Sequence, residues 1–143
     1  TYAGERWIFA AVAGSFLDPL FSTGVSIAME SGIEAAAELD RALTRNRFSA
    51  SEFQAFSRRQ RKRYETFREF VIGFYSPQFR DLFYDANPPN HIFRAVVTVL
   101  AGRWNASLKT RLLNRVFFGL VALQKRFNLT RARFRRDATA GYP

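Results

Sequence analysis

The chain has 143 residues, of which 48% are hydrophobic and 16% aromatic, and it carries a formal net charge of +10. This composition excludes intrinsic disorder, collagen-like sequence and low-complexity sequence, and the length suits one domain or part of one. The absence of cysteine excludes disulfides, a thiolate metal site and a cysteine nucleophile, and it fits a cytoplasmic protein.

The positive charge is concentrated near the C-terminus. Residues 1–102 hold 12 Lys and Arg against 11 Asp and Glu, whereas residues 103–136 hold 10 Lys and Arg and no acid. A basic segment of this kind points to nucleic acid or an anionic membrane as a partner. We expect residues 131–143 to form a basic, disordered tail.

The N-terminal part predicts a strand that leads into a helix. Residues 6–12 form a short apolar and aromatic run, which predicts a buried strand. We expect neither a signal peptide nor a transmembrane segment, because no uncharged apolar run approaches the required length of about 20 residues. Ser22 and Thr23 are typical N-caps for a helix that begins near Val25. Its predicted buried face consists of Val25, Met29, Gly32, Ala36, Leu39 and Leu43.

A second helix is predicted from a capping box at Ser49 and Glu52 to the residue before Pro77. Its predicted inner face consists of Phe53, Phe56, Gln60, Phe67, Val71 and Phe74. The basic run at residues 58–63 resembles a nucleic-acid or import signal. A solvated helix face, with Glu65 and Glu69 as partners one turn away, is the favoured interpretation.

Three more helices follow, so the fold is predicted to be mostly α, with a short strand leading into a helix and then a bundle of helices. They cover residues 78–85, a segment around 92–100, and a last long helix. The predicted buried face of the last helix consists of Leu108, Leu112, Val116, Leu120, Leu123 and Phe127. His91 is the single histidine, so we expect no metal site and assign no catalytic role to it.

The sequence Asp-Pro-Leu-Phe-Ser-Thr-Gly at residues 18–24 resembles the second flavin-contacting motif of the flavin-dependent halogenases, within the FAD-dependent monooxygenases. The resemblance implies the C-terminal piece of an α/β FAD-binding fold, with residues 1–46 on the flavin side and residues 47–130 as a helical substrate-side region. It implies FAD as the cofactor and Thr23 and Gly24 close to a halide. The implied flavin contacts are Asp18, Pro19, Ser22, Thr23, Gly24 and Val25. The implied substrate-side aromatics are Phe74, Tyr75 and Phe79.

The same resemblance implies that reduced flavin reacts with O₂, and that the product hydroxylates a substrate or oxidises chloride. The implied partners are the remainder of the flavoenzyme or a flavin reductase, together with a small aromatic or carrier-bound substrate; no specific nucleic acid is expected. Phe21 stands where tryptophan halogenases have a catalytic Glu, so we expect a substrate other than tryptophan. The family's Gly-rich loop and catalytic Lys lie upstream of the motif, so we expect a C-terminal portion that is inactive alone.

Two alternatives remain open from the sequence. The chain could be a basic helical module that binds nucleic acid or an anionic membrane, with an affinity that falls steeply as salt rises. It could also be a non-catalytic remnant that folds only with another chain, in which case an exposed apolar surface is expected.

Overall fold

The computed structural model describes residues 1–10, 13–85, 89–127 and 129. The chain forms two compact units. The first contains Thr1–Val71 and Leu100–Asn105, and the second contains Ile72–Val99 and the residues from Ala106 onward. The predicted tail at residues 131–143 lies outside the described residues. The predicted division into a flavin side and a substrate side stays a functional prediction.

The first unit begins with a small hairpin. Strands β1 (Ala3–Gly4) and β2 (Trp7–Ile8) pair antiparallel, with Ala3 opposite Ile8. The prediction of a buried strand over residues 6–12 is therefore wrong for residues 6–10, because the strand is only two residues long and Trp7 is 40% exposed. Residues 11 and 12 lie outside the described residues. Arg6 has a φ of 61°, so the chain reverses there and the apolar run pairs with the residues just before it.

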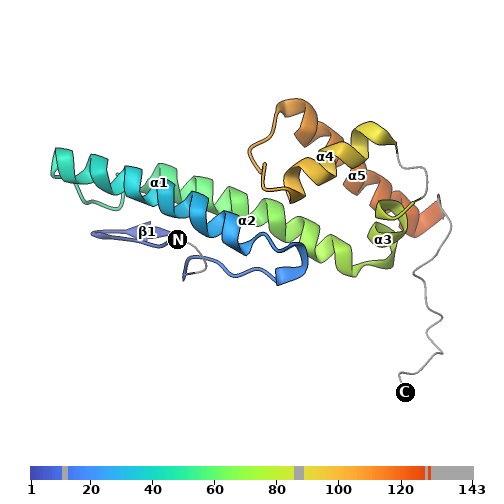
Figure 1. Ribbon diagram of the computed structural model, residues 1–143, viewed down its shortest axis with the longest axis horizontal. Helices are drawn as coiled ribbons and strands as arrows, with labels where there is room; N and C mark the ends of the chain where they lie inside the picture. Colours follow the sequence, from blue (N-terminus) through green and yellow to red (C-terminus); the bar gives the residue numbers. More distant parts are fainter. Residues whose placement is uncertain (11–12, 86–88, 128, 130–143) are drawn as a thin grey trace, which may run out of the picture. The chain divides into compact units, whose positions relative to one another are not determined.

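Two long antiparallel helices form the body of the first unit (Figure 1). They are α1 (Gly24–Arg45) and α2 (Gln54–Tyr75), and α2 continues into the second unit. The hairpin packs against them where the chain turns from α1 to α2. The hydrophobic core at this end consists of Tyr2, Ala3, Ala35, Ala42, Phe53 and Phe56.

Helix α1 buries a different face from the predicted one. Its buried residues are Ser31, Ala35, Glu38 and Ala42. On a helical wheel of 100° per residue, this face lies roughly 110° from the predicted apolar stripe. Within that stripe, Val25 is 72% exposed, Met29 64% and Leu43 67%. The prediction failed because α1 turns acidic side chains, and not its apolar stripe, towards α2.

Helix α2 buries its predicted inner face but begins later than predicted. Phe53, Phe56, Gln60, Phe67 and Val71 are buried, as predicted, and Phe74 is half-buried. The predicted capping box of Ser49 and Glu52 does not form at the start of this helix, since the helix begins at Gln54. The Ser49 hydroxyl lies 2.8 Å from the Ser51 hydroxyl, and the Glu52 carboxylate lies 3.6 Å from the Arg47 guanidinium.

The second unit contains α3 (Pro77–Phe83), most of α4 (Asn90–Leu100) and α5 (Leu108–Phe127). Its core is aromatic: Phe79 is fully buried, and its ring centroid lies 4.9 Å from that of Phe117. Helix α5 buries Asn114, Phe117, Val121 and Gln124. The predicted stripe on α5 is wrong as a buried face, because its residues Leu108 and Leu112 are 80% and 62% exposed.

The prediction of a mostly helical chain with a short N-terminal strand is confirmed. His91 lies exposed in the first turn of α4, as predicted for an ordinary residue. Within the described ranges, no helix is both long enough and apolar enough to cross a bilayer.

Candidate functional site

The segment that precedes α1 is a tight turn. Pro19–Phe21 form a single 3₁₀ turn, and the Asp18 carboxylate accepts a hydrogen bond from the backbone N–H of Leu20 at 3.0 Å. Ser22 adopts the left-handed conformation (φ 52°, ψ 29°), and its N–H donates to the Pro19 carbonyl at 2.8 Å. Asp18 and Pro19 therefore shape the turn, and Ser22 redirects the chain into α1.

The first turn of α1 presents backbone amides without a capping side chain. Thr23 occupies the N-cap position and is 8% exposed, but its hydroxyl makes no capping hydrogen bond. Among the described residues, no acceptor meets the N–H groups of Gly24, Val25 and Ser26, whereas Ile27 N–H bonds the Thr23 carbonyl at 3.0 Å. Unpaired amides and the helix dipole together give this end a partial positive charge that suits an electron-rich or anionic group.

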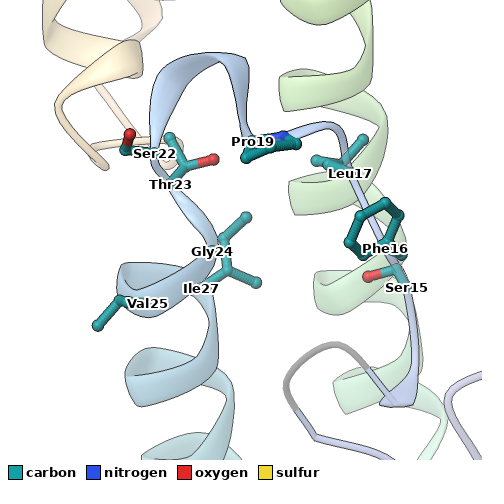
Figure 2. Close-up of a pocket in the computed structure, with 9 residues that line it drawn as sticks. All are labelled: Ser15, Phe16, Leu17, Pro19, Ser22, Thr23, Gly24, Val25 and Ile27. Carbon is teal, nitrogen blue, oxygen red and sulfur yellow. The ribbon is translucent and has the colours of Figure 1, made fainter.

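A pocket of about 280 Å³ opens at this turn (Figure 2). Phe16, Leu17 and Pro19 line it from the segment before the helix, and Gly24 and Ile27 line it from α1. Most of the lining is apolar. A Cβ placed on Gly24 would meet nothing within 4 Å, so the backbone there is open to a close approach. Apolar walls beside unpaired amides can accommodate one edge of a flat ring that carries polar atoms at that edge.

The structure thus brings the six predicted flavin contacts together at one turn. All except Asp18 line the pocket or its rim, and Figure 2 shows Val25 pointing away from the other labelled side chains. The predicted substrate-side aromatics belong to the second unit from residue 72 onward. Phe79 is fully buried there, Phe74 lies 5.9 Å from it between ring centroids, and Tyr75 is 60% exposed. Their role towards a substrate stays a prediction.

A partly buried charge network links α1 and α2, and the sequence reasoning missed it. Arg63 is only 1% exposed, and its guanidinium pairs with Glu34 and, at 3.3 Å, with Glu30. Arg59 donates to Glu38 at 2.6 Å, and Gln60 donates to Glu34 at 2.9 Å. The interpretation of residues 58–63 as a solvated face with Glu65 and Glu69 as partners is therefore wrong for the two arginines that face α1.

The sequence did carry a signal for this network. Glu30, Glu34 and Glu38 recur every four residues on α1, and Arg59 and Arg63 have the same spacing on α2. Residues four apart share one face of a helix, so two complementary charged faces could have been paired. Partial burial lowers the pKa of Arg59, but its hydrogen bonds to Glu38 and Glu34 and the attraction of their charges outweigh this, so the pKa lies above its ordinary value.

The segment at residues 100–105, which is distant in sequence, also contacts α1. Trp104 donates its indole N–H to Glu30 at 3.2 Å, and the Arg63 guanidinium lies over the Trp104 ring at 4.8 Å from its centroid. Gly102 has a φ of 95°, and a Cβ there would lie 3.0 Å from the Ser26 hydroxyl. The segment at residues 100–105 therefore contacts the first two turns of α1, next to the pocket.

Comparison with known proteins places the turn in a family. A family profile described as tryptophan halogenase matches residues 8–106, well over half of the chain. A chlorinase of 1H-pyrrole-2-carbonyl groups on a peptidyl-carrier protein, from Pseudomonas fluorescens, is 32% identical over 72 residues. A flavin-dependent halogenase of Armillaria mellea is 31% identical over 74 residues. These stretches cover 50% and 52% of this chain but only 16% and 15% of the two relatives. The family match includes the turn at residues 18–24, and the chain belongs to the tryptophan halogenase family of flavoprotein oxidoreductases.

Proposed function

We propose that this chain supplies the flavin- and halide-contacting turn of a flavin-dependent halogenase or monooxygenase that uses FAD. The observation that carries the proposal is the start of α1, where the amides of Gly24, Val25 and Ser26 meet no acceptor from the described residues and lie beside an apolar pocket. In this proposal the amides face the electron-rich edge of the flavin ring, and Thr23 and Gly24 lie next to the halide. FAD supplies the oxidising chemistry when it is bound, and the chain supplies orientation and the exclusion of water.

The proposed substrate is a small aromatic or carrier-bound group other than tryptophan. Phe21 occupies the position before Ser22 in the motif, and a phenyl ring cannot exchange a proton with a substrate. The name of the Pseudomonas fluorescens relative, which acts on a pyrrole carried by a protein, supports this class of substrate. Phe74, Tyr75 and Phe79 are the proposed substrate-side aromatics.

The remainder of a flavoenzyme is the proposed partner, with a flavin reductase as the source of reduced flavin. The pocket is small and open, so other protein must cover the rest of the FAD. The exposed side chains of Val25, Met29 and Ile33 on α1, and those of Leu108 and Leu112 on α5, give each unit an apolar helix face. Exposed apolar faces of this kind mark interaction surfaces. In the proposal, the part of the enzyme without a counterpart in the matched stretch packs on them.

The test is a titration of the ¹⁵N-labelled chain with FAD, followed by the chemical shifts of individual amides, because this measurement reports binding residue by residue. The proposal expects shifts at Thr23–Ser26 that a Gly24→Val variant loses. Gly32→Val is the matched control, since Gly32 lies on the same helix and a Cβ there also meets nothing within 4 Å. A wild-type chain whose shifts at Thr23–Ser26 do not move, or a Gly32→Val variant that loses them equally, contradicts the proposal. Chloride added after FAD should move the same amides again.

A further inference from the structure

The segment Leu100–Asn105 connects α4 to α5, yet it packs within the first unit. The backbone N–H of Trp104 donates to the Gly102 carbonyl at 2.9 Å, which closes a tight turn. This turn touches α1 at two successive places. Gly102 lies against Ser26 in the first turn of the helix, and the Trp104 indole N–H bonds Glu30 in the second.

Arg63 holds the same turn from α2. Its guanidinium stacks on the Trp104 ring and lies 3.3 Å from the Glu30 oxygen that accepts the indole N–H. A cation over an indole face is attracted by the ring, most strongly where water is excluded, and Arg63 is fully buried. One carboxylate oxygen of Glu30 therefore accepts the hydrogen bond of the Trp104 indole and forms an ion pair with Arg63, from two elements that are far apart in sequence.

The first turn of α1 needs such support. It has no side-chain cap, and helix termini without caps open locally at low free-energy cost. The side chains of Val25 and Met29 are mostly exposed in the described chain, so they contribute little packing. The contacts of Gly102 with Ser26 and of Trp104 with Glu30 are therefore tertiary contacts that help to hold this turn in place, together with the buried Thr23.

We propose that Trp104, Glu30 and Arg63 are positioning residues that fix the first turn of α1, and with it the amides of Gly24, Val25 and Ser26. Their consequence for catalysis rests on the proposed flavin-contacting role of that turn. None of the three lines the pocket, so they act through the helix and not by contact with cofactor or substrate.

The test is amide hydrogen exchange on the full 143-residue chain without flavin, measured residue by residue. Trp104→Ala should accelerate exchange at Ile27–Met29 by about tenfold and leave Ala42–Arg45 at the far end of α1 unchanged. Trp104→Phe keeps a ring over Arg63 but loses the N–H donor, so its exchange rate at Ile27–Met29 should fall between those of the wild type and Trp104→Ala. Trp7→Ala is the matched control, because Trp7 lies in the hairpin of the same unit.

Two results would overturn the proposal. Exchange at Ile27–Met29 that is the same in Trp104→Ala and Trp7→Ala would show that Trp104 does not fix this turn. Exchange that rises equally along all of α1 would show a general structural role. A Glu30→Gln variant, which keeps an acceptor but loses the charge facing Arg63, should give a smaller local increase of about threefold. If FAD shifts no amide while the local exchange effect holds, the flavin proposal fails and the positioning role stands.

Discussion

Replacing Arg63 by Gln should be among the most damaging single changes in the first unit. The substitution removes a fully buried cation and leaves Glu30 and Glu34 facing each other without it. Breaking a fully buried ion pair costs about 3–5 kcal/mol, because an uncompensated charge stays inside. Here the side chains of Glu30 and Glu34 are 44% and 27% exposed, so solvent screens part of the loss. We expect a loss of about 2–3 kcal/mol in the free energy of unfolding.

Urea unfolding followed by tryptophan fluorescence measures this loss, because Trp7 and Trp104 both lie in the first unit. Arg61→Gln is the matched control. Arg61 lies two residues earlier on α2 and is exposed, so its replacement should change stability by less than about 0.5 kcal/mol. Equal losses for the two variants would refute the assignment of Arg63 to a buried network. The double variant Glu34→Gln/Arg63→Gln should recover about 1 kcal/mol relative to Arg63→Gln, since it removes one of the uncompensated carboxylates.

Three further predictions concern packing and charge. Gly73→Ala should lower the free energy of unfolding by about 1–3 kcal/mol, because the added Cβ would lie 2.8 Å from the Phe79 ring. Gly119→Ala on α5 should raise it by about 0.5–1 kcal/mol, because a Cβ there meets nothing within 4 Å; thermal unfolding followed by circular dichroism measures both changes. Ile33 is 71% exposed, so Ile33→Glu should change the free energy of unfolding by less than about 0.5 kcal/mol. Ala35 is 5% exposed, so Ala35→Glu should prevent folding; a soluble, folded Ala35→Glu chain would contradict the assignment of Ala35 to the buried face of α1. Folding raises the pKa of Arg59, so the contribution of Arg59 to stability is complete below the unfolded pKa and is lost only as pH rises through the still higher folded pKa. The difference in the free energy of unfolding between wild type and Arg59→Gln should therefore stay constant from about pH 7 to about pH 10.

Hydrophobic periodicity predicted where the helices are more reliably than which face each one buries. For α2 the buried face was right and the position was right apart from the start of the helix, because its apolar face packs within the chain, as the burial of Phe56 and Phe67 shows. For α1 the stripe through Val25 and Met29 is real, but the part of the chain that the structure describes leaves it mostly exposed. A pattern at intervals of three and four residues shows that an apolar face exists and carries no information about what covers it. The same limit explains the exposed stripe on α5.

In the candidate site, too, local features could be predicted from the sequence and long-range contacts could not. The turn at residues 18–24 could be predicted, because a local motif of Asp, Pro and Gly determines a local backbone path. The contact between Trp104 and Glu30 spans 74 positions in sequence and has no local signal. Only the four-residue spacing of the acids on α1 and of the arginines on α2 pointed towards a charged interface. Arg63 was missed because a basic run on a helix usually faces solvent.

The charged interface also explains why the Trp104 contact matters for the position of α1. Arg59 bridges Glu38 and Glu34, and Arg63 bridges Glu34 and Glu30, so two arginines face three evenly spaced acids. If α1 slid one turn along α2 in either direction, three of these four pairs could form again. Ion pairs alone therefore select the register only weakly. The Trp104 indole donates a hydrogen bond to the acid at one end of the row, and a slide of four residues, about 6 Å, would break that bond. The register of α1, and hence the place of its first turn, depends on this hydrogen bond of the Trp104 indole as well as on the ion pairs beside it.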